Sequence, residues 1–155
     1  MYDGSAKYMG ASINDAMLQG PDLNSSLRGV LLRFREQPIA FVSDVEKMFN
    51  SFSLPKEQRD SYRFFWFKGN DPEQDIVQYR STCHLFGSRA SPAIACFGLK
   101  YTASHEIANK YPQTVSFLRE GFYVDDGIYS APSVEQAVEI IAGARAVLGL
   151  SLIHI

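Results

Sequence analysis

Three aspartates lie at positions that could support chemistry. Asp44 follows a short apolar run at residues 39–42, with Ser43 between them, and Asp125 and Asp126 are adjacent between two β-rich runs. Adjacent carboxylates repel one another unless a cation lies between them, so an acidic pair with a third carboxylate indicates either a metal site or a solvated turn. Because every donor is an oxygen, the candidate metals are Mg²⁺, Mn²⁺ and Ca²⁺. Taken singly, Asp-Asp-Gly is more often a polar turn, and Asp44 a helix cap.

Two β structures are expected to position these carboxylates. The continuous apolar run at 39–42 is typical of a strand buried on both faces, and residues 45–52 are expected to form a short helix after it. Residues 121–130 carry aromatic and β-branched side chains on both sides of Asp-Asp-Gly, which predicts a hairpin with this tripeptide at its tip. A tight turn can direct both carboxylates towards one site, whereas consecutive side chains on a regular strand point to opposite faces.

The segments outside these two structures predict further helices and a second hairpin. Residues 2–14 are expected to be extended and looped. Apolar residues recur at helical spacing from Leu23 to Phe34, which predicts a helix capped by Asp22 or Asn24 that ends before Pro38. The runs 62–67 and 76–82 are rich in aromatic and β-branched residues and predict a hairpin.

Two more helices are expected in the second half of the chain. Ser91 followed by Pro92 predicts the start of a helix over residues 93–110 that ends before Pro112. Ser133 and Gln136 form a capping-box pattern before a final helix that stops at Gly149. Its inward side is expected to carry Ala137, Val138, Ile141 and Ala144. The predicted fold class is α+β, with helices on one face of an antiparallel sheet.

Composition limits the function classes. The 155 residues are 46% hydrophobic and 21% charged, which excludes a disordered or collagen-like chain and fits one domain, or one domain and a fragment of another. A net charge of -2 argues mildly against nucleic-acid binding. Cys83 and Cys96 are expected to be buried thiols in a reducing compartment. No secretory signal is expected, and Glu139 and Arg145 interrupt the most apolar window, so no membrane span is predicted.

Several stretches, in the right order, resemble the central palm motifs of reverse transcriptases. These are IAFVSDVEKMF at 39–49, HLFG at 84–87 with Ser91-Pro92, and FYVDD at 122–126. Further stretches are similar to the Bel/Pao class of LTR retrotransposons: DGSAK at 3–7, IND at 13–15, QGPDL at 19–23 and GVLLRFR at 29–35. The resemblance covers about residues 2–149. It implies a palm-type antiparallel sheet with helices on one face, plus part of the fingers.

The resemblance also implies a reaction and a metal site. The activity would be template-directed deoxynucleotidyl transfer by an RNA-directed DNA polymerase. Asp44 and Asp125 would hold two Mg²⁺ ions, or Mn²⁺, Asp126 would complete the catalytic triad and metal-ligand set, and the carbonyl of Val45 would be a further ligand. Two such ions would activate the primer 3′-hydroxyl and stabilise the leaving pyrophosphate.

Nucleotide contacts follow from the same resemblance. Phe49 matches the aromatic residue that excludes a 2′-hydroxyl, although an ordinary core aromatic is nearly as good an interpretation. Gly87 matches a position beneath the incoming base, where a residue without a side chain lets the nucleotide approach. Exposed amides after Asp44 could meet a triphosphate. The predicted nucleotide-binding residues are Lys7, Lys47, Met48, Phe49, Phe86, Gly87, Tyr123 and Val124, with Arg89 as a weaker candidate for triphosphate or template contact.

The implied organisation is that of a fragment, and the isolated fragment is expected to be inactive. Residues 1–38 would be a partial fingers segment, 39–149 the palm with a fingers hairpin insertion at about 56–83, and 150–155 an atypical tail. The implied partners are an RNA or DNA template with its primer, deoxynucleoside triphosphates and the remaining pol domains, namely thumb, RNase H, protease and integrase. The implied location is intracellular, in a cytoplasmic virus-like particle. The alternatives are a non-catalytic relic that keeps the fold as a binding or structural module, and an unrelated acidic phosphohydrolase.

Overall fold

The computed structural model describes residues 3–149, so the predicted tail at 150–155 lies outside the described residues. The chain divides into two compact units. The first unit contains the residues up to Leu18 together with Phe49–Ser91, and the second contains Gln19–Met48 together with the residues from Pro92 onward. Small antiparallel sheets and several helices make the chain α+β, as predicted.

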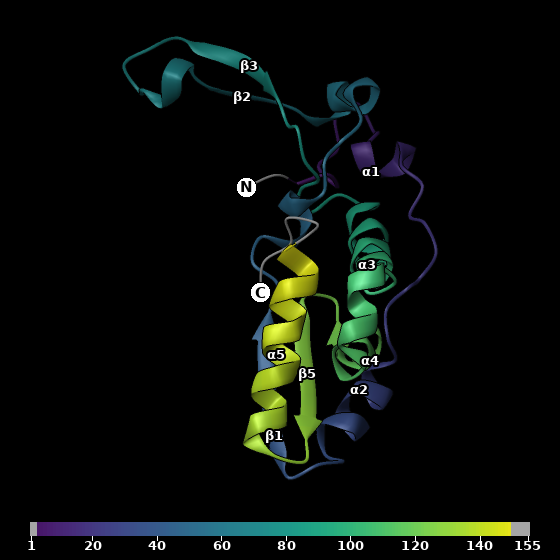
Figure 1. Ribbon diagram of the computed structural model, residues 1–155. Coiled ribbons are helices and arrows are strands. Elements are labelled where there is room, and N and C mark those ends of the chain that lie inside the picture. The colour runs from purple at the N-terminus through teal and green to yellow at the C-terminus, as the bar shows by residue number, and fades with distance from the viewer. Residues whose placement is uncertain (1–2, 150–155) are drawn as a thin grey trace. The chain divides into compact units, whose positions relative to one another are not determined.

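The second unit is built on a three-stranded antiparallel sheet in the order β1-β5-β4 (Figure 1). The strands are β1 (Ile39–Asp44), β4 (Phe122–Tyr123) and β5 (Asp126–Ala131). Strand β1 pairs with β5 from Ile39 opposite Ala131 to Asp44 opposite Asp126. The helices of this unit are α2 (Leu27–Phe34), α3 (Ser91–Thr102, whose first residue belongs to the first unit), α4 (Pro112–Glu120) and α5 (Val134–Gly149), with the short 3-10 helix η4 (Glu106–Lys110) between α3 and α4.

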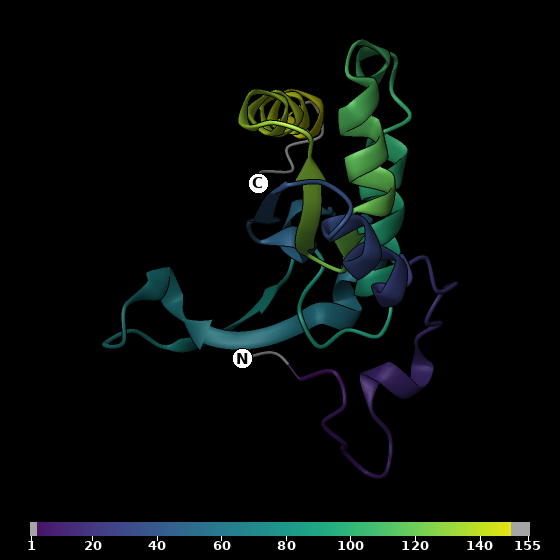
Figure 2. The same cartoon turned by 90° about the horizontal axis from the view of Figure 1, so that it is seen from below.

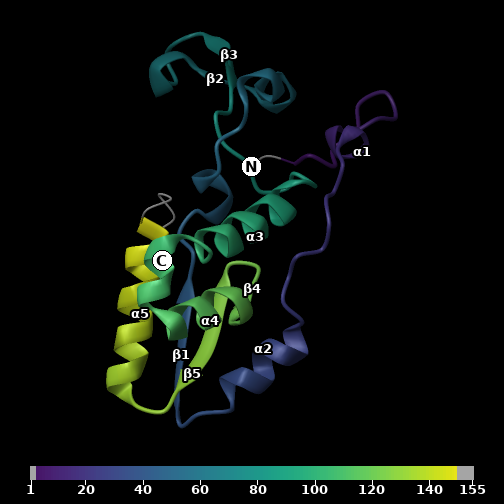
Figure 3. The same cartoon turned by 45° about the vertical axis from the view of Figure 1, so that its right-hand side comes forward.

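Helices α4 and α5 cover one face of this sheet, and the residues of β1 that point to the other face are exposed. Along β1, half-buried Ile39, Phe41 and Ser43 alternate with exposed residues, and Val42 is 70% exposed. The prediction of a strand buried on both faces is therefore wrong, because an antiparallel sheet packs on helices on one side only. Helices α4 and α5 contact each other as well as the sheet, and Figure 3 shows them beside β5. Phe117 of α4 is fully buried, with its ring 5.3 Å from that of Phe41.

Helix α4 was not predicted. The expected helix over 93–110 ends at Thr102 instead, where the Thr102 hydroxyl donates to the Gly98 carbonyl at 2.9 Å and so competes with the helical ladder. Pro112 then occupies the first turn of α4, a position that needs no N–H. The expectation that a helix stops before Pro112 overlooked that the same proline can begin the next one.

Helix α5 begins after Ser133, whose hydroxyl accepts from the Gln136 N–H at 3.3 Å, as the capping pattern predicted. The predicted inward side is right for Ala137 and Ala144 but wrong for Val138, which is 59% exposed. Ile141 is half-buried. The fully buried positions are Ala137, Ile140, Gly143, Ala144, Val147 and Leu148. The buried side of α5 therefore has the helical spacing that includes Ile140, and Val138 and Ile141 lie outside its centre.

The first unit contains the predicted hairpin of β2 (Arg63–Phe67) and β3 (Ile76–Arg80), which Figure 2 shows as a two-stranded ribbon. Its other elements are α1 (Ile13–Ala16), which overlaps the end of the stretch at 2–14 expected to be extended, and three 3-10 helices. These are η1 (Met48–Ser51, whose first residue belongs to the second unit), η2 (Lys56–Tyr62) and η3 (Lys68–Asn70). The helix expected over 45–52 is reduced to η1, because Lys47 has a positive φ of 50° that no regular helix allows.

Helix α2 starts later than predicted, at Leu27, with Ser26 rather than Asp22 or Asn24 at its N-cap. Asp22 instead accepts from the Asn24 N–H at 3.0 Å, which forms a local turn before the helix. Both cysteines are free thiols, and only Cys96 is fully buried, while Cys83 is half-buried. Burial raises the pKa of the Cys96 thiol. Among residues 3–149, no helix is long and apolar enough to cross a membrane.

Candidate active site

Asp44 and Asp126 face each other across β1 and β5. They are directly opposite in the antiparallel register, and Tyr123 of β4 is opposite Asp126 in turn. Residues directly opposite one another project from the same face, with Cβ atoms about 5 Å apart. The two aspartates and Tyr123 therefore form one row across the sheet, on the side that α4 and α5 leave open. All three are exposed.

This surface, which we call the acidic face, is defined by Val42, Asp44, Tyr123, Asp126 and Ile128. The C-terminal end of α2 is bonded to this side of the sheet at Ser130, at the opposite end of β5 from Asp126. There the Ser130 hydroxyl donates to the Arg33 carbonyl at 2.5 Å and accepts from the Gln37 N–H at 3.1 Å. The carboxylates at the other end are left accessible.

The turn between β4 and β5 consists of Val124 and Asp125, one residue earlier than the Asp-Asp-Gly tip predicted from sequence. Asp126 begins β5, so only Asp125 lies in the turn. Val124 has a φ of 59°, the left-handed region that a turn of this size requires at its first central position and that glycine normally supplies. For a β-branched residue this conformation is strained, and such strain of about 1–3 kcal/mol is found mainly at functional sites.

Gly127 allows the sheet to pack tightly beneath the carboxylates. A side chain at this position would come within 2.7 Å of the Phe122 ring and closer still to the Ser43 hydroxyl. That hydroxyl is buried, and no hydrogen-bond partner for it is found among the described residues. Sequence reasoning treated Gly127 only as a turn residue. Its role in packing depends on which residues lie opposite it, and the sequence does not contain that information.

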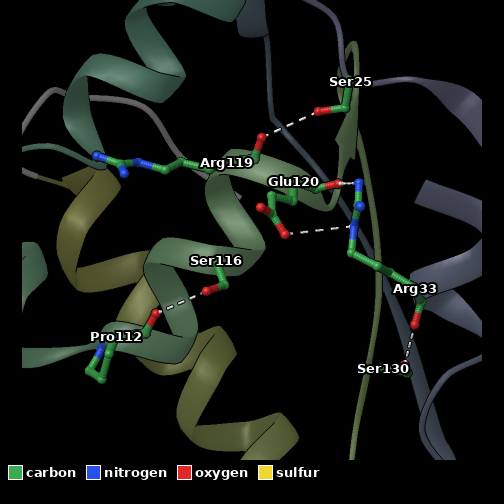
Figure 4. A network of polar contacts seen from close by, with 7 residues as sticks. All are labelled: Ser25, Arg33, Pro112, Ser116, Arg119, Glu120 and Ser130. Atoms are coloured by element: carbon green, nitrogen blue, oxygen red, sulfur yellow. Dashed lines mark hydrogen bonds and ion pairs between the residues drawn. The ribbon is translucent and has the colours of Figure 1, made fainter. Parts of the chain in front are cut away.

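A polar network fixes the segment that leads into β4 (Figure 4). The Arg33 Nη2 donates to the Glu120 carbonyl at 2.7 Å, and the Ser25 hydroxyl donates to the Arg119 carbonyl at 3.3 Å. Glu120 ends α4 immediately before Gly121 and β4. The Gly121 carbonyl in turn accepts from the Ile128 N–H at 2.8 Å. The hairpin that carries Asp125 is therefore held at its base by several hydrogen bonds.

The segment after Asp44 is bonded to the turn. The Val45 N–H donates to the Asp125 carbonyl at 3.2 Å, which extends the ladder and keeps the two acidic segments adjacent. Val45 and Met48 are buried, at 2% and 1% exposure. Lys47 is exposed, and its ammonium lies 3.1 Å from the Glu46 carboxylate. Of the residues predicted to bind nucleotide, Lys47, Tyr123 and Val124 therefore lie close to the three aspartates in the sheet pairing or in the sequence.

The donor set fits a hard divalent cation in its chemistry, since it offers only carboxylate and carbonyl oxygens. Within residues 3–149, however, no group of three or more His, Cys, Asp or Glu side chains is arranged so that it could hold a metal ion as it stands. Side-chain rotation would be needed to gather the triad. The Asp44 and Asp126 side chains are exposed, so packing does not oppose their rotation. Asp125 is half-buried, so its side chain has less room to rotate.

The remaining predicted nucleotide-binding residues belong to the first unit, apart from Met48. Phe49 is 7% exposed and packs edge-on against Phe86 with ring centroids 4.6 Å apart, so it is at least a core aromatic. Phe86 is 52% exposed. Gly87 is exposed and has a positive φ of 85°, a conformation that favours glycine. Lys7 is exposed in the N-terminal segment.

Cavities of about 250 and 200 Å³ lie in the second unit, away from the aspartates. Gln113 and Ile140 line both, and no aspartate lines either. The carboxylates therefore stand on an open surface of the sheet rather than in either of these pockets. Comparison with known proteins found no matching family model and no matching curated protein.

Proposed function

We propose that the chain is the palm and part of the fingers of an RNA-directed DNA polymerase, a reverse transcriptase of the Bel/Pao type. One observation carries this proposal: Asp44 and Asp126, far apart in sequence, are directly opposite in the sheet, and Asp125 is bonded through its carbonyl to Val45. An ordered set of sequence motifs supports it independently. The open acidic face also suits a polymeric substrate better than a small molecule, which usually binds in a concave pocket.

In this proposal the three aspartates bind the divalent ions that position the reacting groups. When bound, a pair of divalent ions supplies a Lewis acid that activates the primer 3′-hydroxyl and neutralises charge on the leaving pyrophosphate. Asp44 and Asp126 project from the same face of the sheet and hold the ions there, with Asp125 and the Val45 carbonyl as further ligands. The strained turn at Val124 and the bonded base of the hairpin limit the movement of these ligands.

The other predicted residues are proposed to select and hold the nucleotide. Lys7, Lys47 and the backbone at Met48 would contact the triphosphate. Phe49 would pack against the sugar and exclude a 2′-hydroxyl, which makes deoxynucleotides the substrates. Phe86, Gly87, Tyr123 and Val124 complete the proposed set.

The partners follow from the reaction. They are an RNA or DNA template with its primer, deoxynucleoside triphosphates, and the remaining domains of a pol polyprotein. The proposed ions are Mg²⁺ or Mn²⁺, and the proposed location is a cytoplasmic virus-like particle.

Single-nucleotide addition tests this function. The chain, joined to the thumb and RNase H domains that the proposal implies, is incubated with poly(rA)·oligo(dT), dTTP and either Mg²⁺ or Mn²⁺, and extension of the primer is measured. We expect metal-dependent addition that Asp125→Asn reduces at least a hundredfold, because a metal ligand is lost. Synthesis by Asp125→Asn at the parental rate would show that the assignment is wrong. A chain that adds no nucleotide and binds no Mn²⁺ would favour the non-catalytic relic.

A further inference from the structure

Asn14 of α1 holds the loop around Gly87 at two points. Its Nδ2 donates to the Gly87 carbonyl at 2.9 Å, and its Oδ1 accepts from the Arg89 N–H at 2.9 Å. A single amide side chain thus makes the same donor and acceptor bonds that a neighbouring β-strand would make. The loop conformation depends on this support, since Gly87 has a positive φ of 85° and is exposed.

The contact extends to the backbone on both sides. The Asn14 N–H donates to the Gly4 carbonyl at 2.9 Å, and the Arg89 guanidinium donates to the Asn14 carbonyl at 3.3 Å. Gly4 is buried, and a side chain there would come within 2.7 Å of the Gly87 carbonyl oxygen and 2.8 Å of Asn14 Oδ1. The N-terminal segment and the Gly87 loop are therefore fitted together without space for a methyl group.

Ser88 anchors the same loop from the buried side. It is 4% exposed, and its hydroxyl lies 2.7 Å from the Tyr62 hydroxyl and 3.4 Å from the Met17 sulfur. Asn14 therefore bonds to Gly87 and Arg89, while Ser88 between them contacts Tyr62 and Met17. With both sides fixed, the exposed backbone of Gly87 has little conformational freedom left to lose when a ligand binds.

We propose that Asn14 is a positioning residue for the nucleotide: it holds the Gly87 loop in the conformation that accepts the incoming base. This inference rests on the proposed function, which assigns Gly87 to the nucleotide. Asn14 acts on the loop through Gly87 and Arg89, and its Nδ2 also donates to the Ser5 hydroxyl at 3.1 Å. Its loss should therefore weaken nucleotide binding and leave divalent-ion binding at the aspartates intact, because those residues belong to the other unit.

The test compares Asn14→Ala with Asp15→Ala in the full chain. Asp15 is a matched control because its carboxylate accepts from the Ser12 N–H at the start of α1 and, among residues 3–149, does not bond to the Gly87 loop. Hydrogen exchange is measured for the amides of residues 86–90. Binding of fluorescent mant-dTTP is measured with Mg²⁺ and poly(rA)·oligo(dT), and Mn²⁺ binding is measured by calorimetry. Should Asn14→Ala not fold, Asn14→Asp replaces it, since that change removes the donor to Gly87 and keeps the acceptor for Arg89.

We expect Asn14→Ala to speed loop exchange and to weaken mant-dTTP binding about tenfold, the effect of losing the two hydrogen bonds to the loop, with Mn²⁺ binding unchanged. Asp15→Ala should leave both loop exchange and nucleotide affinity near parental values. If the parental chain binds mant-dTTP and Asn14→Ala binds it equally tightly, the positioning role is wrong and the proposed function is unaffected. If the parental chain binds no nucleotide, the proposed function fails and the positioning role fails with it.

Discussion

The two sheets have similar aromatic strand sequences, but their aromatic side chains differ in burial. In the second unit, Phe41 and Tyr129 lie on the face of β1 and β5 that α4 covers, and Phe117 fills the space between them. In the first unit, Phe64 and Tyr79 stack across β2 and β3 with ring centroids 5.8 Å apart, yet Phe64 is 43% and Phe65 71% exposed. Aromatic and β-branched composition specifies strands in both, but only helix packing decides which strands are buried.

This difference has a functional counterpart. The covered sheet is rigid on one face and presents carboxylates on the other, an arrangement that can hold ligands in fixed positions. The hairpin of β2 and β3 is a two-stranded ribbon, which is marginally stable by itself in water.

The largest expected effect separates the two aromatic sets. Phe117→Ala should lower the free energy of unfolding by about 3–5 kcal/mol, because it leaves a cavity between α4 and the sheet. Phe65→Ala, on the exposed ribbon, should change it by less than about 0.5 kcal/mol. Urea denaturation followed by circular dichroism measures both. Equal losses for the two variants would show that the ribbon is packed as tightly as the sheet.

The next effect is a pH dependence that belongs to the first unit. Burial lowers the pKa of His84, which is 4% exposed, below its ordinary value of 6.5. The unfolded chain therefore takes up the proton first as the pH falls. Stability should be complete above about pH 6.5 and should decrease below it, by at most about 1.4 kcal/mol per pH unit from this group.

Denaturation at pH 7.5 and pH 5.5 measures this dependence. His84→Gln should flatten the decrease, whereas His105→Gln, at an exposed position, should leave it unchanged. A variant of His84 with the parental pH dependence would show that another group is responsible.

The smallest effect contrasts the two turns. Val124→Gly should raise the free energy of unfolding by about 1 kcal/mol, since glycine relieves the strain of a β-branched residue at a φ of 59°. Gly69 has a φ of 67° with open space around it, so Gly69→Ala should lower stability by a similar amount through backbone strain alone. Thermal unfolding of the two variants measures both. A destabilised Val124→Gly would mean that the valine side chain contributes packing that outweighs its strain.

The sequence predicted what depends on local chemistry. Both hairpins, the capping of α5 by Ser133 and the α+β class follow from residue types and short spacings. The positions of Asp44 at the end of a strand and of Asp125 in a turn followed in the same way.

What was missed depends on contacts between distant residues. The exposure of Val42, the tight fit at Gly127 and the two bonds of Asn14 to the Gly87 loop arise from partners that no local pattern specifies. Helix α4 is different, because its signal was present: Pro112 was interpreted only as a stop. The turn position was also wrong, since Asp126-Gly127 is the stronger local turn pattern but pairing with β1 draws Asp126 into the strand.

Calorimetric titration of the full chain with Mn²⁺ tests most directly whether the three aspartates form one site. We predict binding that Asp44→Asn, Asp125→Asn and Asp126→Asn each weaken at least tenfold. Asp75→Asn, which removes an exposed carboxylate in the loop between β2 and β3, should leave the affinity unchanged. If the three variants bind Mn²⁺ as the parental chain does, or if Asp75→Asn weakens binding equally, the carboxylates do not act as a common metal site.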